Sequence, residues 1–307
     1  MSITIFSHAA CALHRVTEVH PECPERLGAV NDQLIRSGLE YVITQKDATQ
    51  ANKNDLYRAH DVAYVNDVYA KAPSDPENHV WLDPDTVMTA GTLEAALYAA
   101  GSGINGIDEI MQSANQRAFC AVRPPGHHAT RSAAMGFCVF NNIAVAALYA
   151  LHEYDIQRIA IIDFDVHHGN GTEDIFLQDD RVLFCSSFQH PLYPNTGTDT
   201  ISPHVINIPM PAGCEGFEWQ AAVRERWFPA IDAFAPDLIL VSAGFDGHLE
   251  DDMAQFNLRE DDYFWIGKEL KKLADMHCQG RMLAMLEGGY DFSSLGRSVV
   301  AFLKGIL

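Results

Sequence analysis

Short apolar runs rich in β-branched residues recur along the chain, and stretches with helical periodicity lie between several of them. Such runs are typical of buried strands, whereas apolar residues spaced three and four apart indicate helices. The predicted strands are Ile3–Phe6, Ala118–Val122, Arg158–Phe164, Val182–Ser186, Val205–Ile208, Asp237–Ala243 and Arg281–Leu286. The predicted helices include Thr86–Met111, Asn142–Tyr154 and Glu218–Phe234. This alternation predicts an α/β three-layer sandwich with a central, mainly parallel sheet. No repeat or long linker divides the chain, so we expect residues 1–307 to form a single domain.

The strand candidate that ends near Phe164 runs directly into a cluster of polar side chains. Because side chains alternate along a strand, Asp163, Asp165 and His167 are predicted to project to one side. Ligands of open α/β sheets bind at the carboxyl ends of strands, which is where these residues fall. A solvated strand end explains one aspartate and one histidine, but it explains such a dense cluster poorly. We therefore predict a divalent metal site here.

Three other predicted strands also end in polar turns that contain glycine. The four segments are Arg123–Ala129, Asp163–Thr172, Ser242–Gly247 and Glu287–Tyr290. Functional residues concentrate on loops that a rigid scaffold positions, and parallel strands end at one edge of their sheet. We expect these four turns to build one site.

The chain has 307 residues, 48% of them hydrophobic, and a formal net charge of −20. This charge argues against nucleic acid or an anionic membrane as a partner and would favour a cationic substrate. The seven cysteines include no CxxC pair, and neither a secretory signal nor an apolar run long enough to cross a membrane is visible. We expect a reduced, cytoplasmic protein.

Asp165, His167 and Asp246 are the predicted metal ligands. Three protein ligands with one open position are typical of catalytic zinc, and the absence of cysteine excludes a zinc finger. Fe²⁺ or Co²⁺ could use the same nitrogen and oxygen ligands. Two carboxylates offset most of the charge of the ion, so such a site gains from a separate general base.

The adjacent His127 and His128 can supply that base. Asp163 and Asn170 are the predicted orienting partners of the two rings, one charged and one neutral. An anionic partner raises the pKa of its histidine and a neutral amide does not, so the two rings can differ in protonation. Tyr290 can donate a hydrogen bond to a developing oxyanion. Together these groups predict hydrolysis of an acyl group.

The motifs RPPGHHA, GFCVFNN, DFDVHHGNGT, SAGFD and EGGYD stand in this order along the chain, and HPECPERL precedes them. This series resembles the zinc-dependent histone deacetylase and acetylpolyamine amidohydrolase superfamily, on its class II side. The resemblance implies an arginase-like fold, zinc on Asp165, His167 and Asp246, and an oxyanion donor in Tyr290. It further implies an acyl tunnel, a rim aspartate, an arginine behind the site and a structural potassium ion. The residues that match these features are Gly136, Phe137 and Tyr193 for the tunnel, Asp83 for the rim, Arg26, and Asp163 with Ser187 for potassium.

Two substrate classes stay open, and the cues for them conflict. Pro21-Glu22-Cys23 resembles a motif that narrows the entrance in polyamine-selective members. Spacing puts Met253 at the position where those members carry an acid, although a shift of one residue would bring Asp252 there. We expect an acetylpolyamine or another small cationic acetylated amine, with an acetyl-lysine peptide or protein as the alternative.

Two further alternatives belong to other functional classes. A metalloprotein that binds acylated ligands without turnover would be expected to lack a histidine, a ligand or the tyrosine, and all are present. A binuclear arginase-like hydrolase would need further carboxylate or histidine ligands, and the chain offers few. About one metal ion per chain would indicate a deacetylase, and about two would indicate the arginase type.

Overall fold

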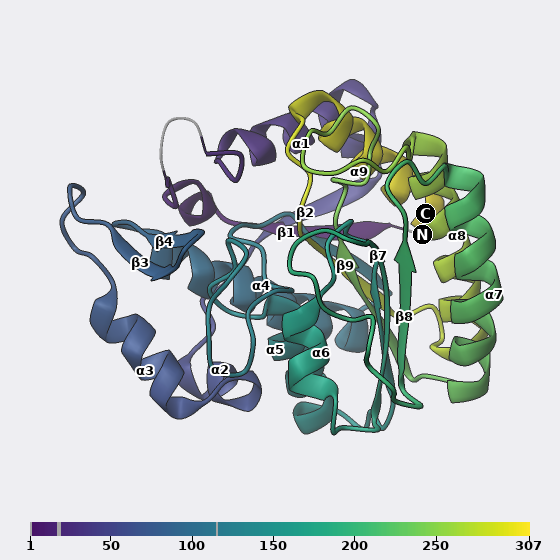
Figure 1. Ribbon diagram of the computed structural model, residues 1–307, viewed down its shortest axis with the longest axis horizontal. Coiled ribbons are helices and arrows are strands. Elements are labelled where there is room, and N and C mark those ends of the chain that lie inside the picture. Colours follow the sequence, from purple (N-terminus) through teal and green to yellow (C-terminus); the bar gives the residue numbers. More distant parts are fainter. Residues whose placement is uncertain (1, 17–19, 115) are drawn as a thin grey trace.

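An eight-stranded sheet forms the centre of the molecule (Figure 1), in a computed structural model that describes residues 2–16, 20–114 and 116–307. Neighbouring strands in this sheet pair in parallel throughout, which confirms the predicted fold class. In spatial order the strands are β2 (Ile43–Asp47), β1 (Ile3–Ser7), β5 (Arg117–Cys120), β10 (Met282–Leu286), β9 (Leu238–Ala243), β6 (Ile159–Asp163), β7 (Val182–Gln189) and β8 (Val205–Met210).

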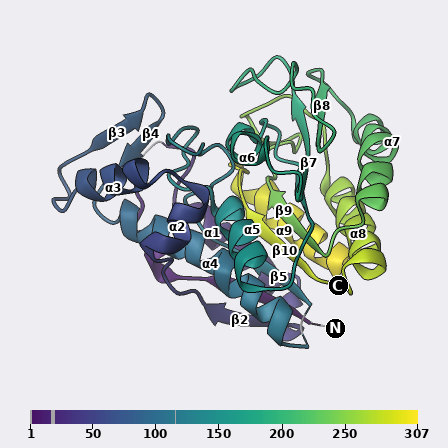
Figure 2. The ribbon, with the colours of Figure 1, turned by 90° about the horizontal axis from the view of Figure 1, so that it is seen from below.

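Helices cover both faces of the sheet and give the three layers (Figures 1 and 2). One face packs against α1 (Glu25–Arg36), α7 (Gly216–Phe234), α8 (Glu260–His277) and α9 (Phe292–Ile306). The other face packs against α2 (Lys53–Ala59), α3 (Val62–Lys71), α4 (Thr92–Gln112), α5 (Asn142–Glu153) and α6 (Asn170–Phe176). Short 3₁₀ helices span Ala9–Ala12 and Leu39–Tyr41.

Strand β6 shows why the apolar runs form the middle of the sheet. Its residues are all buried, with Ile159 and Ile161 in one core cluster and Ala160 and Ile162 in the other. Because the strand contributes side chains to both cores, its first four residues are all apolar, and not only the alternate ones. The polar residues therefore begin only where the strand ends.

The structure corrects one predicted helix. Residues 86–111 do not form a continuous helix, because β4 (Thr86–Met88) pairs antiparallel with β3 (Val80–Asp83). Gly91 separates β4 from α4 with a backbone φ of 91°, and a Cβ there would lie 2.8 Å from Cβ of Leu13. Glycine adopts this left-handed conformation without strain, so the helix begins only at Thr92.

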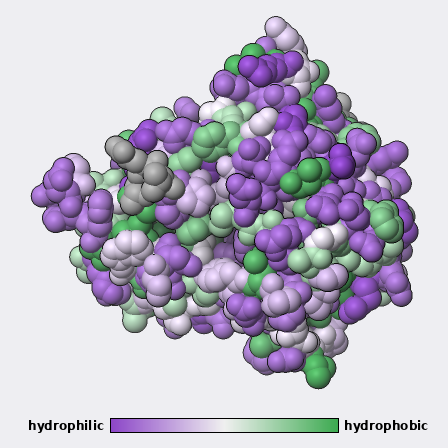
Figure 3. Space-filling view, turned by 45° about the horizontal axis from the view of Figure 1, so that its top comes forward, coloured by the Kyte–Doolittle hydropathy of each residue, from purple (hydrophilic) through white to green (hydrophobic). Residues whose placement is uncertain are grey.

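The strand order determines where the site lies. Strands β5, β10, β9 and β6 are consecutive neighbours in the sheet, and each is followed by one of the four polar turns. Their carboxyl ends lie at one edge, as expected for parallel strands. Of the helices within the described residues, none combines the length and apolar character needed to cross a membrane. The face in Figure 3 is mainly hydrophilic, with its apolar residues dispersed.

Candidate active site

Asp165, His167 and Asp246 come together at the carboxyl ends of β6 and β9. Nδ1 of His167 lies 3.1 Å from Oδ1 of Asp165 and 3.1 Å from Oδ2 of Asp246. All three residues are buried, and their candidate ligand atoms lie within 4.8 Å of one another. Strand β6 ends at Asp163, so Asp165 and His167 lie on the loop that follows it. The conformation of that loop, and not the predicted alternation along a strand, brings these two residues together.

These donors fit a zinc ion. Two carboxylate oxygens and one imidazole nitrogen are ligands that zinc accepts in catalytic sites. Burial and the neighbouring charge of Asp165 raise the pKa of Asp246 to about 7, so the site without a cation disfavours two ionised carboxylates. A divalent cation offsets such repulsion. The described residues contain one such group of potential ligands, so the second ligand set of a binuclear hydrolase is not found among them.

The tandem histidines lie beside this group and have the two predicted partners. Nδ1 of His127 lies 2.9 Å from Oδ2 of Asp163, and Nδ1 of His128 lies 2.7 Å from Oδ1 of Asn170. The two ring centroids are 4.0 Å apart, and both side chains are buried. Asn170 is the first residue of α6, and its amide nitrogen donates to Sδ of Met135 at 3.1 Å.

The two imidazoles differ in their preferred charge. Burial disfavours a charged His127, but the carboxylates of Asp163 and Asp165 outweigh burial and raise its pKa well above the ordinary value. Burial lowers the pKa of His128 well below its ordinary value, and the charge on His127 lowers it further. His128 is therefore the neutral ring, which can accept a proton, while its neighbour carries charge.

A cavity of about 140 Å³ opens onto these residues. His128, His167 and Tyr290 form its polar part, and Phe137, Tyr193 and Met253 supply apolar walls. Gly136 and Asp85 complete the lining. The ring centroids of His128 and Tyr193 are 5.3 Å apart in an edge contact, and those of Phe137 and Tyr290 are 6.1 Å apart. The lining therefore combines two histidines and a tyrosine with apolar side chains.

Backbone conformation places the wall at Gly136 and Phe137. Both residues have positive φ, 57° and 66° respectively. A Cβ on Gly136 would lie 2.3 Å from Cδ2 of His128, so glycine is required for this close approach. Positive φ is strained for phenylalanine, and surrounding contacts must hold it. Gly136 N–H donates to Oδ1 of Asp85 at 2.9 Å, and Phe137 N–H donates to Oγ1 of Thr86 at 3.1 Å.

The structure places Asp85, and not the predicted Asp83, at the cavity. Oδ1 of Asp83 accepts the backbone N–H of Asp85 at 2.9 Å, so Asp83 shapes the turn between β3 and β4. The Asp85 carboxylate accepts hydrogen bonds that outweigh burial and lower its pKa. The family resemblance had pointed to Asp83 alone, and Asp85 was not among the predicted site residues.

Two buried residues outside the predicted reacting set support it. Glu287 accepts the backbone N–H groups of Gly126 and His127 through Oε2, at 2.7 and 3.1 Å, and the hydroxyl of Ser242 through Oε1 at 3.1 Å. Arg26 donates to the carbonyl oxygens of Gly289 and Glu287, and its guanidinium lies 4.8 Å from the ring centroid of Tyr290. An acid directly after a buried strand was the sequence signal for Glu287.

The loop after β9 places one of its residues, Met253, in the wall of the cavity. Met253 lines the cavity, whereas Asp251 is buried and accepts the backbone N–H groups of Met253, Tyr290 and Asp291. Glu250 pairs with Arg297 at 2.8 Å. These contacts hold the loop with Met253 in the wall of the cavity, while Glu250, Asp251 and Asp252 border adjoining space that Met253 and Tyr290 also line.

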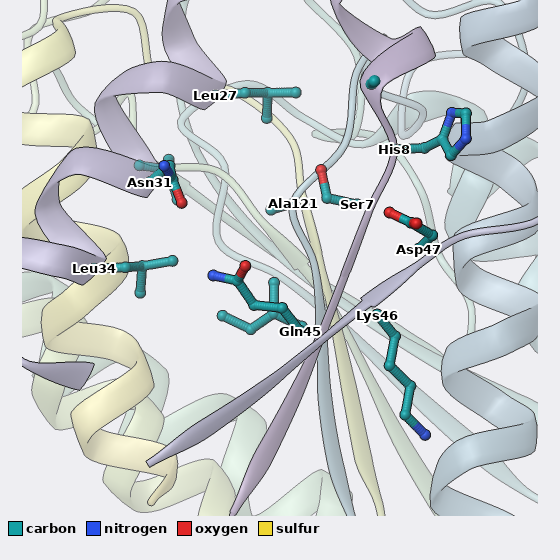
Figure 4. Close-up of a pocket in the computed structure, with 12 residues that line it drawn as sticks. Ser7, His8, Leu27, Asn31, Leu34, Gln45, Lys46, Asp47 and Ala121 are labelled. Atoms are coloured by element: carbon teal, nitrogen blue, oxygen red, sulfur yellow. The ribbon is translucent and has the colours of Figure 1, made fainter. Parts of the chain in front are cut away.

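A second hollow of about 280 Å³ lies between α1 and strands β1 and β2 (Figure 4). Asn31 and Gln45 contribute amides to it, and Leu27 and Leu34 contribute apolar surface. Within the described part of the chain, the candidate metal group lies at the other cavity and not here. The reacting groups therefore place the active site in the smaller cavity.

Known proteins match this chain along nearly its whole length. Residues 20–306 match the sequence profile of the histone deacetylase domain. The chain belongs to the histone deacetylase family. It is 34% identical to histone deacetylase 14, chloroplastic, of Arabidopsis thaliana, over 99% of this chain and 76% of that protein. It is 35% identical to mouse polyamine deacetylase HDAC10, over 94% of this chain and 45% of that protein.

A solved structure in the family shares the fold. The HDA15 HD domain superposes with a TM-score of 0.92 at 32% identity, covering 99% of this chain and 88% of that one. The family is zinc-dependent, and the chain is a deacetylase of the hydrolase class. The relatives differ in their named substrates, so substrate choice rests on the residues of the cavity.

Proposed function

We propose that this deacetylase hydrolyses the amide of an N-acylated linear amine inside the cavity of about 140 Å³ and so releases the free primary amine. The observation that carries the proposal is that His128, His167 and Tyr290 all line that cavity. Asp165, His167 and Asp246 would hold zinc, which when bound polarises a carbonyl and acidifies water. The remaining chemistry belongs to the side chains around the cavity.

His128 is neutral and accepts the proton of the attacking water, while Asn170 holds its ring. His127 stays charged against Asp163 and stabilises negative charge that develops beside it. Tyr290 keeps its proton because burial raises its pKa well above the ordinary value, so its hydroxyl can donate to the carbonyl oxygen. The carbon–nitrogen bond of the amide then breaks, the acyl group leaves as the carboxylic acid, and the proton on His128 passes to the nitrogen of the leaving amine.

We propose acyl-lysine in a peptide or protein as the substrate, because Met253 lies in the cavity wall. A thioether packs against the aliphatic chain of a lysine, and it offers no charge to a second ammonium group. The sequence had favoured a polyamine, on the resemblance of Pro21-Glu22-Cys23, while the spacing pointed to Met253 but left open a shift of one residue that would bring an acid to its position.

An acetylpolyamine is the second candidate, and Asp85 is the observation that favours it. This carboxylate lines the cavity and has a lowered pKa, so it is ionised at neutral pH and can attract a distant ammonium. The net charge of −20 would help to steer either cationic substrate toward the entrance.

The test compares kcat/KM of the zinc-loaded protein on an acetyl-lysine peptide with that on acetylputrescine and acetylspermidine. A preference of ~10-fold or more for the peptide supports Met253 as the determinant. A preference of ~10-fold or more for the polyamines supports Asp85 as the determinant instead. Absence of turnover on every linear acyl amide would refute the proposed function.

The potassium ion that the family resemblance implies is proposed at the loop that starts at Asp163. Oδ1 of Asp163 accepts the backbone N–H of Asp165 at 3.1 Å, and Oγ of Ser187 accepts the indole N–H of Trp219 at 2.9 Å. Both oxygens retain lone pairs, so a hard monovalent cation is compatible with them. Titration of the potassium-free protein with KCl, followed by thermal unfolding, tests this site.

A further inference from the structure

One long loop forms the cavity wall and joins the tandem histidines to α5. We call residues 130–141 the wall loop. It starts two residues after His128, carries Gly136 and Phe137 at its tip, and ends at Asn141, the N-cap of α5. Met135 and Cys138 form a short antiparallel bridge below the tip. Anything that fixes the two ends of this loop also fixes the wall and the neighbouring histidine.

His60 contacts both ends of the wall loop. It follows α2, and its side chain is buried with 1% exposure. Nδ1 lies 2.9 Å from the carbonyl oxygen of Thr130, and Nε2 accepts the backbone N–H of Asn141 at 2.9 Å. The first partner can only accept and the second can only donate, so the ring must be neutral with its proton on Nδ1.

Two residues that follow His60 in the chain, Asp85 and Thr86, hold the tip of the wall loop. Asp85 and Thr86 accept the backbone N–H groups of Gly136 and Phe137. The segment from His60 to Thr86 therefore binds the wall loop at its base and at its tip. The strained φ of Phe137 makes such support necessary, because nothing local favours that conformation.

We propose that His60 is a positioning residue that clips the two ends of the wall loop together and so sets the width of the acyl cavity. Its effect on turnover rests on the proposed function, whereas its effect on the loop does not. Because it touches neither substrate nor the candidate metal ligands, it acts through Thr130 and Asn141. An imidazole is suited to this task because its two nitrogens can donate and accept at once.

The ring also packs beside aromatic side chains, which offers a competing explanation. Its centroid lies 5.4 Å from that of Tyr64 and 5.7 Å from that of Phe140. A residue retained only for this packing would tolerate His60→Phe and would be damaged by His60→Gln. If His60 acts through its hydrogen bonds, His60→Phe is the damaging change, because phenylalanine removes both bonds. His60→Gln is then tolerated, because glutamine can supply a donor and an acceptor.

The experiment measures amide hydrogen exchange across residues 130–141, together with kcat, KM and zinc content, in both variants. In His60→Phe we expect these amides to exchange ~10-fold faster or more, because a buried donor and acceptor lose their partners. KM should rise by a similar factor with zinc content unchanged. His60→Gln should stay within ~2-fold of the wild type in exchange and KM.

Val68→Ala is the matched control, because Val68 is fully buried on α3 in the same core. It should lower thermal stability without selective loosening of the wall loop. The proposed role of His60 is overturned if the amides of residues 130–141 exchange at the wild-type rate in His60→Phe, or ~10-fold faster in His60→Gln. If His60→Phe does not fold, His60→Gln decides alone. If the wild type has no turnover, the proposed function fails and the exchange results still decide the role of His60.

Discussion

Replacing Met253 by glutamate should change substrate preference through charge alone. The new carboxylate would lie in the wall that Met253 now lines, next to Tyr290. Opposite unit charges ~5 Å apart attract by roughly 3 kcal/mol at an effective dielectric constant of about 20. Access of solvent to the entrance and its ions reduces this to about 1–2 kcal/mol. We therefore expect kcat/KM for acetylspermidine to rise by ~5- to 30-fold.

Met253→Gln is the control, because it has the shape of glutamate and no charge. kcat/KM is measured for both variants on acetylspermidine and on an acetyl-lysine peptide, at low and at high salt. The gain on the polyamine should fall with salt in Met253→Glu, since an exposed ion pair is screened. An equal gain in Met253→Gln, or no gain in either variant, would refute the argument that charge at this position selects the substrate.

The remaining predictions concern catalysis, stability and metal. Tyr290→Phe should retain zinc and lose ~10²-fold or more in kcat, and a near-wild-type rate would remove the hydroxyl from its role. Glu287→Ala should lower the free energy of unfolding by about 3 kcal/mol or more, because three buried donors lose their acceptor; in Glu287→Gln, which keeps an oxygen, denaturant unfolding should show a much smaller loss. Burial lowers the pKa of His60 from 6.5 to about 4, so the unfolded chain binds the proton more readily. The free energy of unfolding should accordingly fall by about 3 kcal/mol as pH decreases from 6.5 to 4, and urea titrations of His60→Gln should lack that part of the slope. Stripping metal with a chelator should abolish turnover and lower Tm, and about one zinc per chain, not two, should restore both.

The sequence by itself determined the sheet and the end of it at which the chemistry lies. Buried parallel strands must be apolar on both faces, so runs such as Ile159–Asp163 can be read directly from residue type. Polar residues immediately after such runs then fall at one edge, because all the strands point the same way. The metal group and the tandem histidines could be predicted for this reason. Strand β2 could not, because it is an edge strand with mostly exposed, polar residues.

Only the tertiary structure decided how the loops direct their side chains. A loop has no periodicity, so contacts with distant segments set its conformation. The hydrogen bonds from Tyr290 and Asp291 to Asp251 place Met253 in the wall, which spacing alone left uncertain by one residue. Asp85 similarly reaches the cavity in place of Asp83.

The buried side chains that hold the site in place, His60 and Glu287, show most clearly what the sequence alone does not reveal. His60 lies 81 residues from Asn141, and Glu287 lies 161 residues from Gly126. Neither pair shares a motif or a local spacing, since each hydrogen bond joins a side chain to a backbone group of arbitrary residue type. The sequence therefore predicted the candidate reacting groups, whose chemistry requires particular residues. The fold alone determined which buried side chains hold those groups in place.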